Sequence, residues 1–336
     1  MNNEITNKLK HLNDDYEKLK GHRFSHFFCP ILFKDEITEL CKGHIVNQAF
    51  SNSPRAWTVQ RKDVDGFYGH NFEADFTALE YRIAKLTPDR AILDSKFSNK
   101  LKPKILVDGQ QVDYFISNRS RQSDFTRMEI ESNSTTAEIV LKMRPEDVES
   151  ALGANWEIEI NKDIKLQSLV SLIKAAHLTL FEILGYFYAL SSGGYFVGRQ
   201  ILGEFYFQNK NKASKPEVLE NANSFFKEFI NMVRPVESFA YDLKGTVTDK
   251  ILFVCKNQYG YWSFIVFIRT SEKLHSVMIP NFDKPEKVAT FTDFLKTQKE
   301  IHLSGNFCRF DKSKNQWEID KKSHELIWPQ SGFIID

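Results

Sequence analysis

The chain has 336 residues, a formal net charge of +1, 42% hydrophobic residues and 13% aromatic residues, among them 29 Phe. This length predicts two domains, and the apolar content supplies packed cores, which excludes a largely disordered protein. The near-zero net charge excludes a strong overall attraction to nucleic acid but permits local binding. The four Cys are widely spaced, which indicates a reducing compartment rather than a disulfide framework. We therefore expect a soluble, cytoplasmic protein without a membrane-spanning helix.

The N-terminal part of the chain predicts a helix, a hairpin and a second helix. Residues 3–20 place apolar side chains at spacings of three and four, which indicates an amphipathic helix ending near Gly21. Two apolar runs, 27–33 and 37–41, predict a β-hairpin with His44 on or just after its second strand. We expect residues 37–46 to pair with residues 27–33. After a turn-rich stretch, apolar residues at helical spacing predict a helix over 63–86, ended by Pro88.

The rest of the chain predicts a larger α+β domain. A Lys- and Ser-rich linker at 95–104 precedes short strands, which are predicted at 105–107, 112–116, 127–131, 138–143 and 156–160. Two helices are predicted at 166–190, with a stop at residues 191–194, and at 216–233. The later elements are strands at 251–255, 262–268 and 276–279, a helix at 285–297 and a hairpin at 307–319. His177 lies on the apolar face of the helix at 166–190 and is interpreted as a core residue.

The stretch from residue 24 to residue 76 resembles a known family. It holds Cys29 before an apolar run, His44 within Gly-His-Ile-Val-Asn, and Asp65 near the start of the predicted helix. In this order it resembles the HNH endonucleases, in particular the branch with Cys pairs and a Glu-His-Ile-Ile-Pro-like motif. The resemblance implies a ββα-metal unit at about 22–90, within an N-terminal domain of residues 1–95. Residues 96–336 would form an α+β domain for substrate selection, oligomerisation or sensing.

The resemblance also implies a reaction, which is hydrolysis of phosphodiester bonds, in DNA by preference, with one divalent metal ion, Mg²⁺ or Mn²⁺. His44 matches the catalytic His that takes a proton from water. Asp65 matches the helical metal ligand, and Asp63, His70 and Asn71 are the alternatives. For Asp63 and Asp65, capping of the helix N-terminus is an equal alternative.

Two further groups of residues have chemical interpretations. Candidate nucleic-acid contacts, which would hold phosphates or stack on bases, are Arg55, Arg61, Lys62 and Trp57. The residues whose spacing permits a structural zinc site are Cys29, Cys41, His22 and His26. Two buried free thiols are the commoner outcome of such a pattern, so we do not expect structural zinc.

Three departures from the HNH pattern support an alternative function. Gly43 stands where many members have a metal ligand, and Val46 and Asn47 replace Ile-Pro. The residues in place of the second Cys-x-x-Cys-Asn are Arg61, Val64 and Asp65. The alternative is a catalytically degenerate unit that binds nucleic acid or protein. The expected partners are nucleic acid, a second copy of the chain, or a protein of a bacterial defence system or mobile element, and no membrane.

Overall fold

The structure of the protein is a computed structural model. It describes residues 3–46, 56–77, 104–107, 110–117, 126–131, 141–143, 156–159, 163–236, 251–269, 274–281, 287, 300–311 and 316–329. The chain forms two compact units: Met1–Ala74 with Leu166–Asp336 is unit 1, and Asp75–Lys165 is unit 2. The predicted division is a single boundary after residue 95. In the structure the chain leaves unit 1 after Ala74 and returns to it at Leu166. The expected fold class, α+β, is confirmed.

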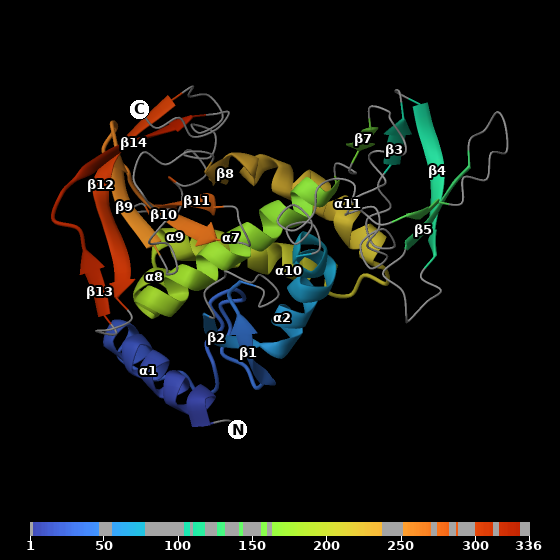
Figure 1. The fold of residues 1–336 in the computed structure, drawn as a ribbon. Helices are drawn as coiled ribbons and strands as arrows, with labels where there is room; N and C mark the ends of the chain where they lie inside the picture. Colours follow the sequence, from blue (N-terminus) through green and yellow to red (C-terminus); the bar gives the residue numbers. More distant parts are fainter. Residues whose placement is uncertain are drawn as a thin grey trace. The chain divides into compact units, whose positions relative to one another are not determined.

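Unit 1 begins with the predicted amphipathic helix α1, Asn3–Lys20. Its buried stripe consists of Ile5, Leu12 and Tyr16. The helix ends at Gly21, whose φ of 75° lies in the left-handed region that glycine adopts without steric cost. In Figure 1, α1 lies beside the short helix α8.

The predicted hairpin between residues 27–33 and 37–46 is wrong in its pairing. Strand β1, Leu40–His44, pairs antiparallel with β2, Trp57–Arg61, in the register Leu40↔Arg61 and His44↔Trp57. Residues 27–33 instead form a buried turn, in which the Phe33 amide donates to the carbonyl of Cys29. Pro30 within this run has no amide hydrogen to give to a sheet. Most apolar residues of the run are buried, as in a strand, so composition alone misleads here.

A helix follows β2 without a loop, and its predicted start is confirmed. Helix α2, Lys62–Tyr68, continues into one turn of π-helix, η1, Gly69–Glu73. The predicted helix extended to residue 86, but residues 78–103 lie outside the described part of the chain. We call β1, β2, α2 and η1 together the ββα segment.

A long central helix and a series of shorter helices follow unit 2. Helix α7, Asp163–Leu184, confirms most of the predicted helix at 166–190, but it ends at Gly185, where φ is 57°. By length and composition α7 passes for a membrane span, yet 78% of its apolar window is buried within the structure. It lies beside α2 and the β1–β2 hairpin in Figure 1. This burial is that of a core helix.

The segment after α7 is more helical than the sequence predicts. The preceding helix ends at Leu190, as the predicted stop at 191–194 requires, but the stop is brief: the Ser191 hydroxyl accepts a hydrogen bond from the Gly194 amide and caps a new helix. The helices that follow are α8 (Tyr186–Ala189), α9 (Ser192–Tyr195), η3 (Phe196–Gly203) and α10 (Glu204–Asn209). The glycines permit close approach: a Cβ added at Gly194 or Gly203 would overlap the backbone of Tyr188 or Ile31. The predicted helix at 216–233 is confirmed as α11 (Lys215–Phe226) and η4 (Lys227–Met232).

An antiparallel sheet of seven strands completes unit 1 (Figure 1). Its strands are β8 (Val233–Val236), β9 (Ile251–Asn257), β10 (Trp262–Arg269), β11 (Leu274–Asn281), β12 (Glu300–Asp311), β13 (Gln316–Ile319) and β14 (His324–Pro329). The order is β13-β12-β9-β10-β11-β8, with β14 also paired to β12. The predicted strands at 251–255, 262–268 and 276–279 and the hairpin at 307–319 are confirmed. The predicted helix at 285–297 lies outside the described residues, except for residue 287.

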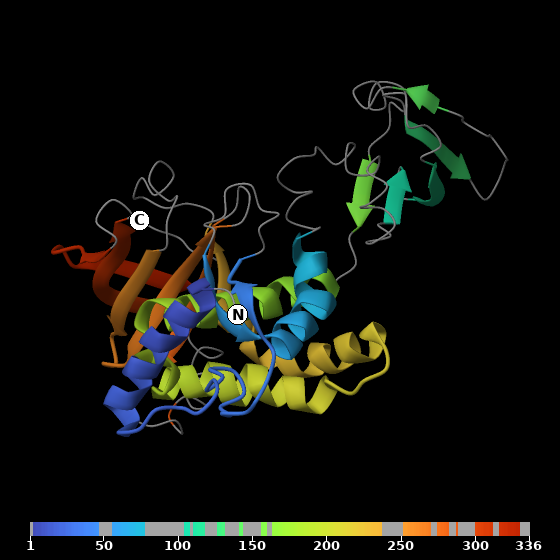
Figure 2. The same ribbon diagram turned by 90° about the horizontal axis from the view of Figure 1, so that it is seen from below.

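Unit 2 contains a second antiparallel sheet, shown in Figure 2. Its strands are β3 (Lys104–Val107), β4 (Gln110–Ser117), β5 (Thr126–Glu131), β6 (Leu141–Met143) and β7 (Trp156–Glu159). They lie in the order β6-β5-β4-β3-β7. The five predicted strands are therefore confirmed, while nearly all of the predicted linker at 95–104 lies outside the described residues.

Candidate functional site

A buried lysine lies at the centre of the ββα segment. The Nζ atom of Lys174 is 3.0 Å from Oδ1 of Asp65 and 2.6 Å from Oε1 of Glu73. The side chain of Lys174 is 1% exposed, whereas those of Asp65 and Glu73 are 30% and 20% exposed. The ammonium also lies 5.7 Å from the centre of the Tyr68 ring. We call Lys174, Asp65 and Glu73 the lysine cluster.

Lys174 keeps its charge in the folded protein. Burial alone would lower the pKa of Lys174, but the attraction of Glu73 and Asp65 outweighs burial, and the pKa is raised overall. The ammonium therefore stays protonated at neutral pH. The thiol of Cys41 lies 3.8 Å from Asp65, and burial together with this carboxylate raises its pKa to about 11. A thiol with this pKa is not a nucleophile at neutral pH.

The other carboxylate at the start of α2 is bound by an arginine. Asp63 accepts hydrogen bonds from Arg61 at 2.8 and 3.1 Å and from the Tyr206 hydroxyl at 3.0 Å. Burial would raise the pKa of Asp63, but the bonds from Arg61 and Tyr206 lower it overall. Arg61 also donates to Glu36 at 3.0 Å. Asp63 also accepts from the Val64 amide within the first turn of α2, whose N-cap residue is Arg61.

His44 lies on a different face of the hairpin from the residue that contacts Asp65. Successive side chains of a strand point to opposite faces, so Cys41 and Gly43 share one face of β1 and His44 lies on the other. The contact with Asp65 comes from Cys41, which is about 10 Å along the strand from His44. The predicted proximity of His44 to the segment 63–71 therefore stays a prediction.

The packing of Gln60 explains why residue 43 is a glycine. A Cβ atom at this position would overlap the side-chain amide of Gln60. Gln60 is 3% exposed, so its amide has little room to move. A metal-binding carboxylate before His44 would therefore require Gln60 to leave its place.

The other two alternative metal ligands, His70 and Asn71, make different contacts from those of the lysine cluster. The carbonyl oxygen of His70 accepts from Lys215, and the His70 side chain is exposed. The amide of Asn71 donates to the carbonyl of Phe67 within the same helix. Among the described residues, no group of three or more His, Cys, Asp or Glu side chains is arranged to hold a metal ion.

The predicted nucleic-acid contacts are mostly engaged within the protein. Arg61 is 9% exposed and held by Asp63 and Glu36, so it is not available to a phosphate. Lys62 is exposed and paired with Glu39 at 2.8 Å. The ammonium groups of Lys8 and Lys42 lie over the ring of Trp57, at 4.8 and 5.0 Å from its centre. Arg55 lies outside the described residues.

The four residues considered for zinc do not form a common site among the described residues. Cys29 is 2% exposed and its sulfur accepts from the Leu32 amide, and burial raises the pKa of this thiol to about 11. Cys41 instead contacts Asp65. The ring of His22 bonds to the carbonyl of Lys20, and His26 is exposed. All four Cys of the chain are free thiols.

The interpretation of His177 as a core residue is confirmed. It is fully buried, its Nδ1 lies 2.9 Å from the Tyr188 hydroxyl, and its Nε2 lies 3.1 Å from the carbonyl of Pro30. Burial lowers its pKa to about 4, so the ring is neutral at pH 7.

Lys174 and Tyr206 are the important residues that sequence reasoning missed. Lys174 is the one Lys, Arg, Asp or Glu in the run 166–181. A lysine in such a position needs a buried partner, and this was the available signal. Tyr206 carried no comparable signal, because it lies in the unpredicted helical segment.

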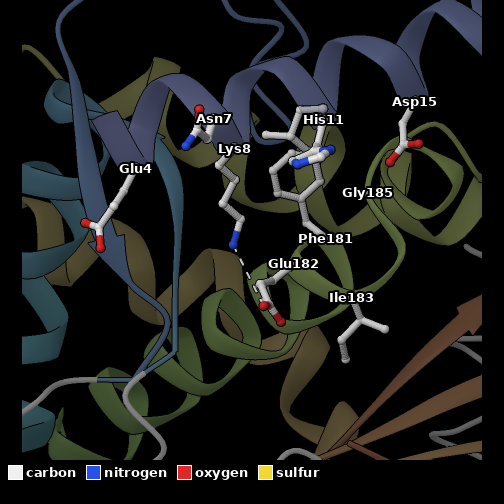
Figure 3. Close-up of a pocket in the computed structure, with 10 residues that line it drawn as sticks. Glu4, Asn7, Lys8, His11, Asp15, Phe181, Glu182, Ile183 and Gly185 are labelled. Carbon is white, nitrogen blue, oxygen red and sulfur yellow. Dashed lines mark ion pairs between the residues drawn. The ribbon is translucent and has the colours of Figure 1, made fainter. Parts of the chain in front are cut away.

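A cavity of about 430 Å³ lies between α1 and the C-terminal end of α7 (Figure 3). Leu12 and Phe181 contribute apolar surface to it. Each carboxylate of its lining already faces a lysine: the pairs are Glu4 with Lys42, Asp15 with Lys18, and Glu182 with Lys8. His11 is exposed at its rim. These pairs neutralise the lining, and we assign no reaction to this cavity.

Comparison with known proteins identified no relative of the chain. No family model, no curated protein and no solved structure matches the chain.

Proposed function

We propose that the ββα segment is a catalytically degenerate HNH-like unit, which takes part in binding nucleic acid or protein and cleaves neither. The resemblance of residues 24–76 to the HNH endonucleases supports the class of partner. We further propose that the protein acts in the cytoplasm, in a bacterial defence system or with a mobile element, since other HNH-like units are found in such settings.

The lysine cluster is the observation that carries this proposal. A divalent metal in an HNH-like unit needs carboxylate or amide oxygens close together. Here the ammonium of Lys174 lies between Asp65 and Glu73 and offsets part of the negative charge that would attract such a metal. A lysine bound at 2.6 and 3.0 Å occupies the same oxygen atoms that a metal would use. The residues around Asp65 therefore do not fit a magnesium or manganese ion.

Two further contacts support the loss of catalysis. Gly43 leaves room for the buried amide of Gln60 rather than supplying a ligand beside His44. His44 lies on the face of β1 away from the Cys41–Asp65 contact, whereas a general base must lie beside the phosphate that it serves.

Metal-dependent cleavage by His44 and Asp65 is the competing function, and a plasmid assay separates the two. Supercoiled plasmid and single-stranded DNA are incubated with the wild type and with His44→Ala, in magnesium or manganese and with EDTA as control. Our proposal predicts equal, background cleavage by both proteins. Cleavage that needs the metal and is lost in His44→Ala at unchanged thermal stability would overturn it.

A further inference from the structure

Three large aromatic side chains are exposed at the turn between β9 and β10. Tyr259, Tyr261 and Trp262 are 53%, 39% and 51% exposed. Burying an aromatic side chain in the core stabilises a protein by about 1.5–3 kcal/mol. The three exposed side chains at this turn do not contribute stability in this way. Adjacent exposed aromatic residues on a protein surface indicate a binding site. We call residues 256–262 the aromatic turn.

The aromatic turn is held in one conformation by hydrogen bonds. The side-chain oxygen of Asn257 accepts from the amides of Tyr259 and Tyr261, at 3.0 and 2.9 Å. Gln258 bonds to His302 of the neighbouring strand β12 through both its backbone amide and its side-chain oxygen, at 3.1 and 2.7 Å. Gly260 has a φ of 84°, which completes the tight turn. The rings are therefore presented on a preorganised support, and binding loses little conformational entropy of the backbone.

The charge of the aromatic turn is positive. Its sequence, Lys-Asn-Gln-Tyr-Gly-Tyr-Trp, contains one lysine and no acidic residue. The ammonium of Lys256 lies 5.6 Å from the centre of the Trp262 ring. On the sheet, Lys256 is paired with Ser304, and the nearest acidic side chain along this row is Glu325, one strand further. Glu325 is thus about 10 Å from Lys256 across two strand spacings.

We propose that the aromatic turn binds single-stranded nucleic acid, with bases stacked on Trp262 and Tyr259 and a phosphate held by Lys256. Exposed aromatic rings next to a lysine suit this ligand, because every base has a face that stacks and every nucleotide carries a negative charge. Intact duplex binds less well, since its bases are already stacked on one another. The aromatic turn lies in the C-terminal sheet, so this inference is independent of whether the ββα segment cleaves or binds.

The test measures the affinity of the full chain for fluorescein-labelled oligothymidylate and oligouridylate by fluorescence anisotropy, with EDTA present. Trp262→Ala is expected to weaken binding about 5- to 150-fold, which corresponds to one lost stacked base of about 1–3 kcal/mol. Trp262→Phe keeps a ring and is expected to retain most of the affinity. Ile230→Ala, which removes an exposed apolar side chain elsewhere on unit 1, is the matched control and should bind like the wild type.

The contribution of Lys256 is read from the dependence on salt. Lys256→Gln should reduce the slope of log affinity against log salt concentration by about 0.7, the value for one phosphate contact on a single strand. The inference is overturned if the wild type binds neither oligonucleotide. That is the result expected if the aromatic turn binds a protein partner instead. The inference is equally overturned if Trp262→Ala binds as tightly as the wild type. Because EDTA prevents metal-dependent cleavage, the outcome does not depend on the nuclease assay above.

Discussion

Replacing Lys174 by Met tests whether the lysine cluster holds the ββα segment together. Met has nearly the volume of Lys but carries no charge, so Lys174→Met leaves Asp65 and Glu73 facing each other without a counterion. Removing one partner of a fully buried ion pair costs about 3–5 kcal/mol. Because the two carboxylates are 30% and 20% exposed, water offsets part of this cost, and we expect a loss of about 2–4 kcal/mol.

The assay is urea unfolding at pH 7, followed by fluorescence and circular dichroism. The pKa of Lys174 is raised, so its contribution is fully present at this pH and is lost only as the pH rises beyond the ordinary lysine value of 10.5. The triple variant Lys174→Met, Asp65→Asn, Glu73→Gln removes all three charges and should recover much of the loss. Lys212→Met is the control, since its pair with Glu217 is exposed and contributes about 0–1 kcal/mol. A Lys174→Met protein as stable as this control would refute the reasoning.

Two other predictions concern buried groups on neighbouring helices. Burial lowers the pKa of His177 to about 4, so between pH 6.5 and pH 4 the unfolded chain binds more protons than the folded chain. The free energy of unfolding therefore falls as the pH drops through this range, in total by about 3 kcal/mol. Urea midpoints at pH 7 and pH 5 should differ less in His177→Gln than in the wild type, and equal differences would contradict the assignment. Tyr206→Phe removes the hydroxyl that donates to Asp63 at 3.0 Å and should cost about 1 kcal/mol in urea unfolding. Tyr195→Phe is its control, because Tyr195 is 37% exposed, and equal stability of the two variants would argue against the Asp63 contact.

The elements with a clear local pattern are those that the sequence predicts well. Helix α7 shows apolar residues at helical spacing, and strands β9, β10 and β11 are short β-branched and aromatic runs bounded by turn residues. In such segments the local preference and the tertiary packing agree. The segment 196–209 is helical despite two glycines, because close backbone contacts favour Gly198 and Gly203 there. Tertiary contacts of this kind leave no local signal.

The candidate site shows the same limit more sharply. The order of His44, Asp63 and Asp65 along the chain supports a metal site, and the start of α2 at Lys62 agrees with it. The pairing partner of β1 and the ion that Asp65 binds are set by contacts between distant residues. Lys174 lies 109 positions after Asp65, with the whole of unit 2 between them. A single sequence does not indicate that such a lysine takes the position that a metal would need.

Binding of Mn²⁺ to the purified wild-type chain tests the central claim most directly. Electron paramagnetic resonance measures free Mn²⁺ during a titration, and the Asp65→Asn variant is titrated in parallel. Because Lys174 binds one carboxylate oxygen of Asp65 and one of Glu73, we predict that wild type and Asp65→Asn take up Mn²⁺ equally weakly. Stoichiometric, tight Mn²⁺ binding by the wild type that is lost in Asp65→Asn would contradict the account and restore the metal-dependent nuclease.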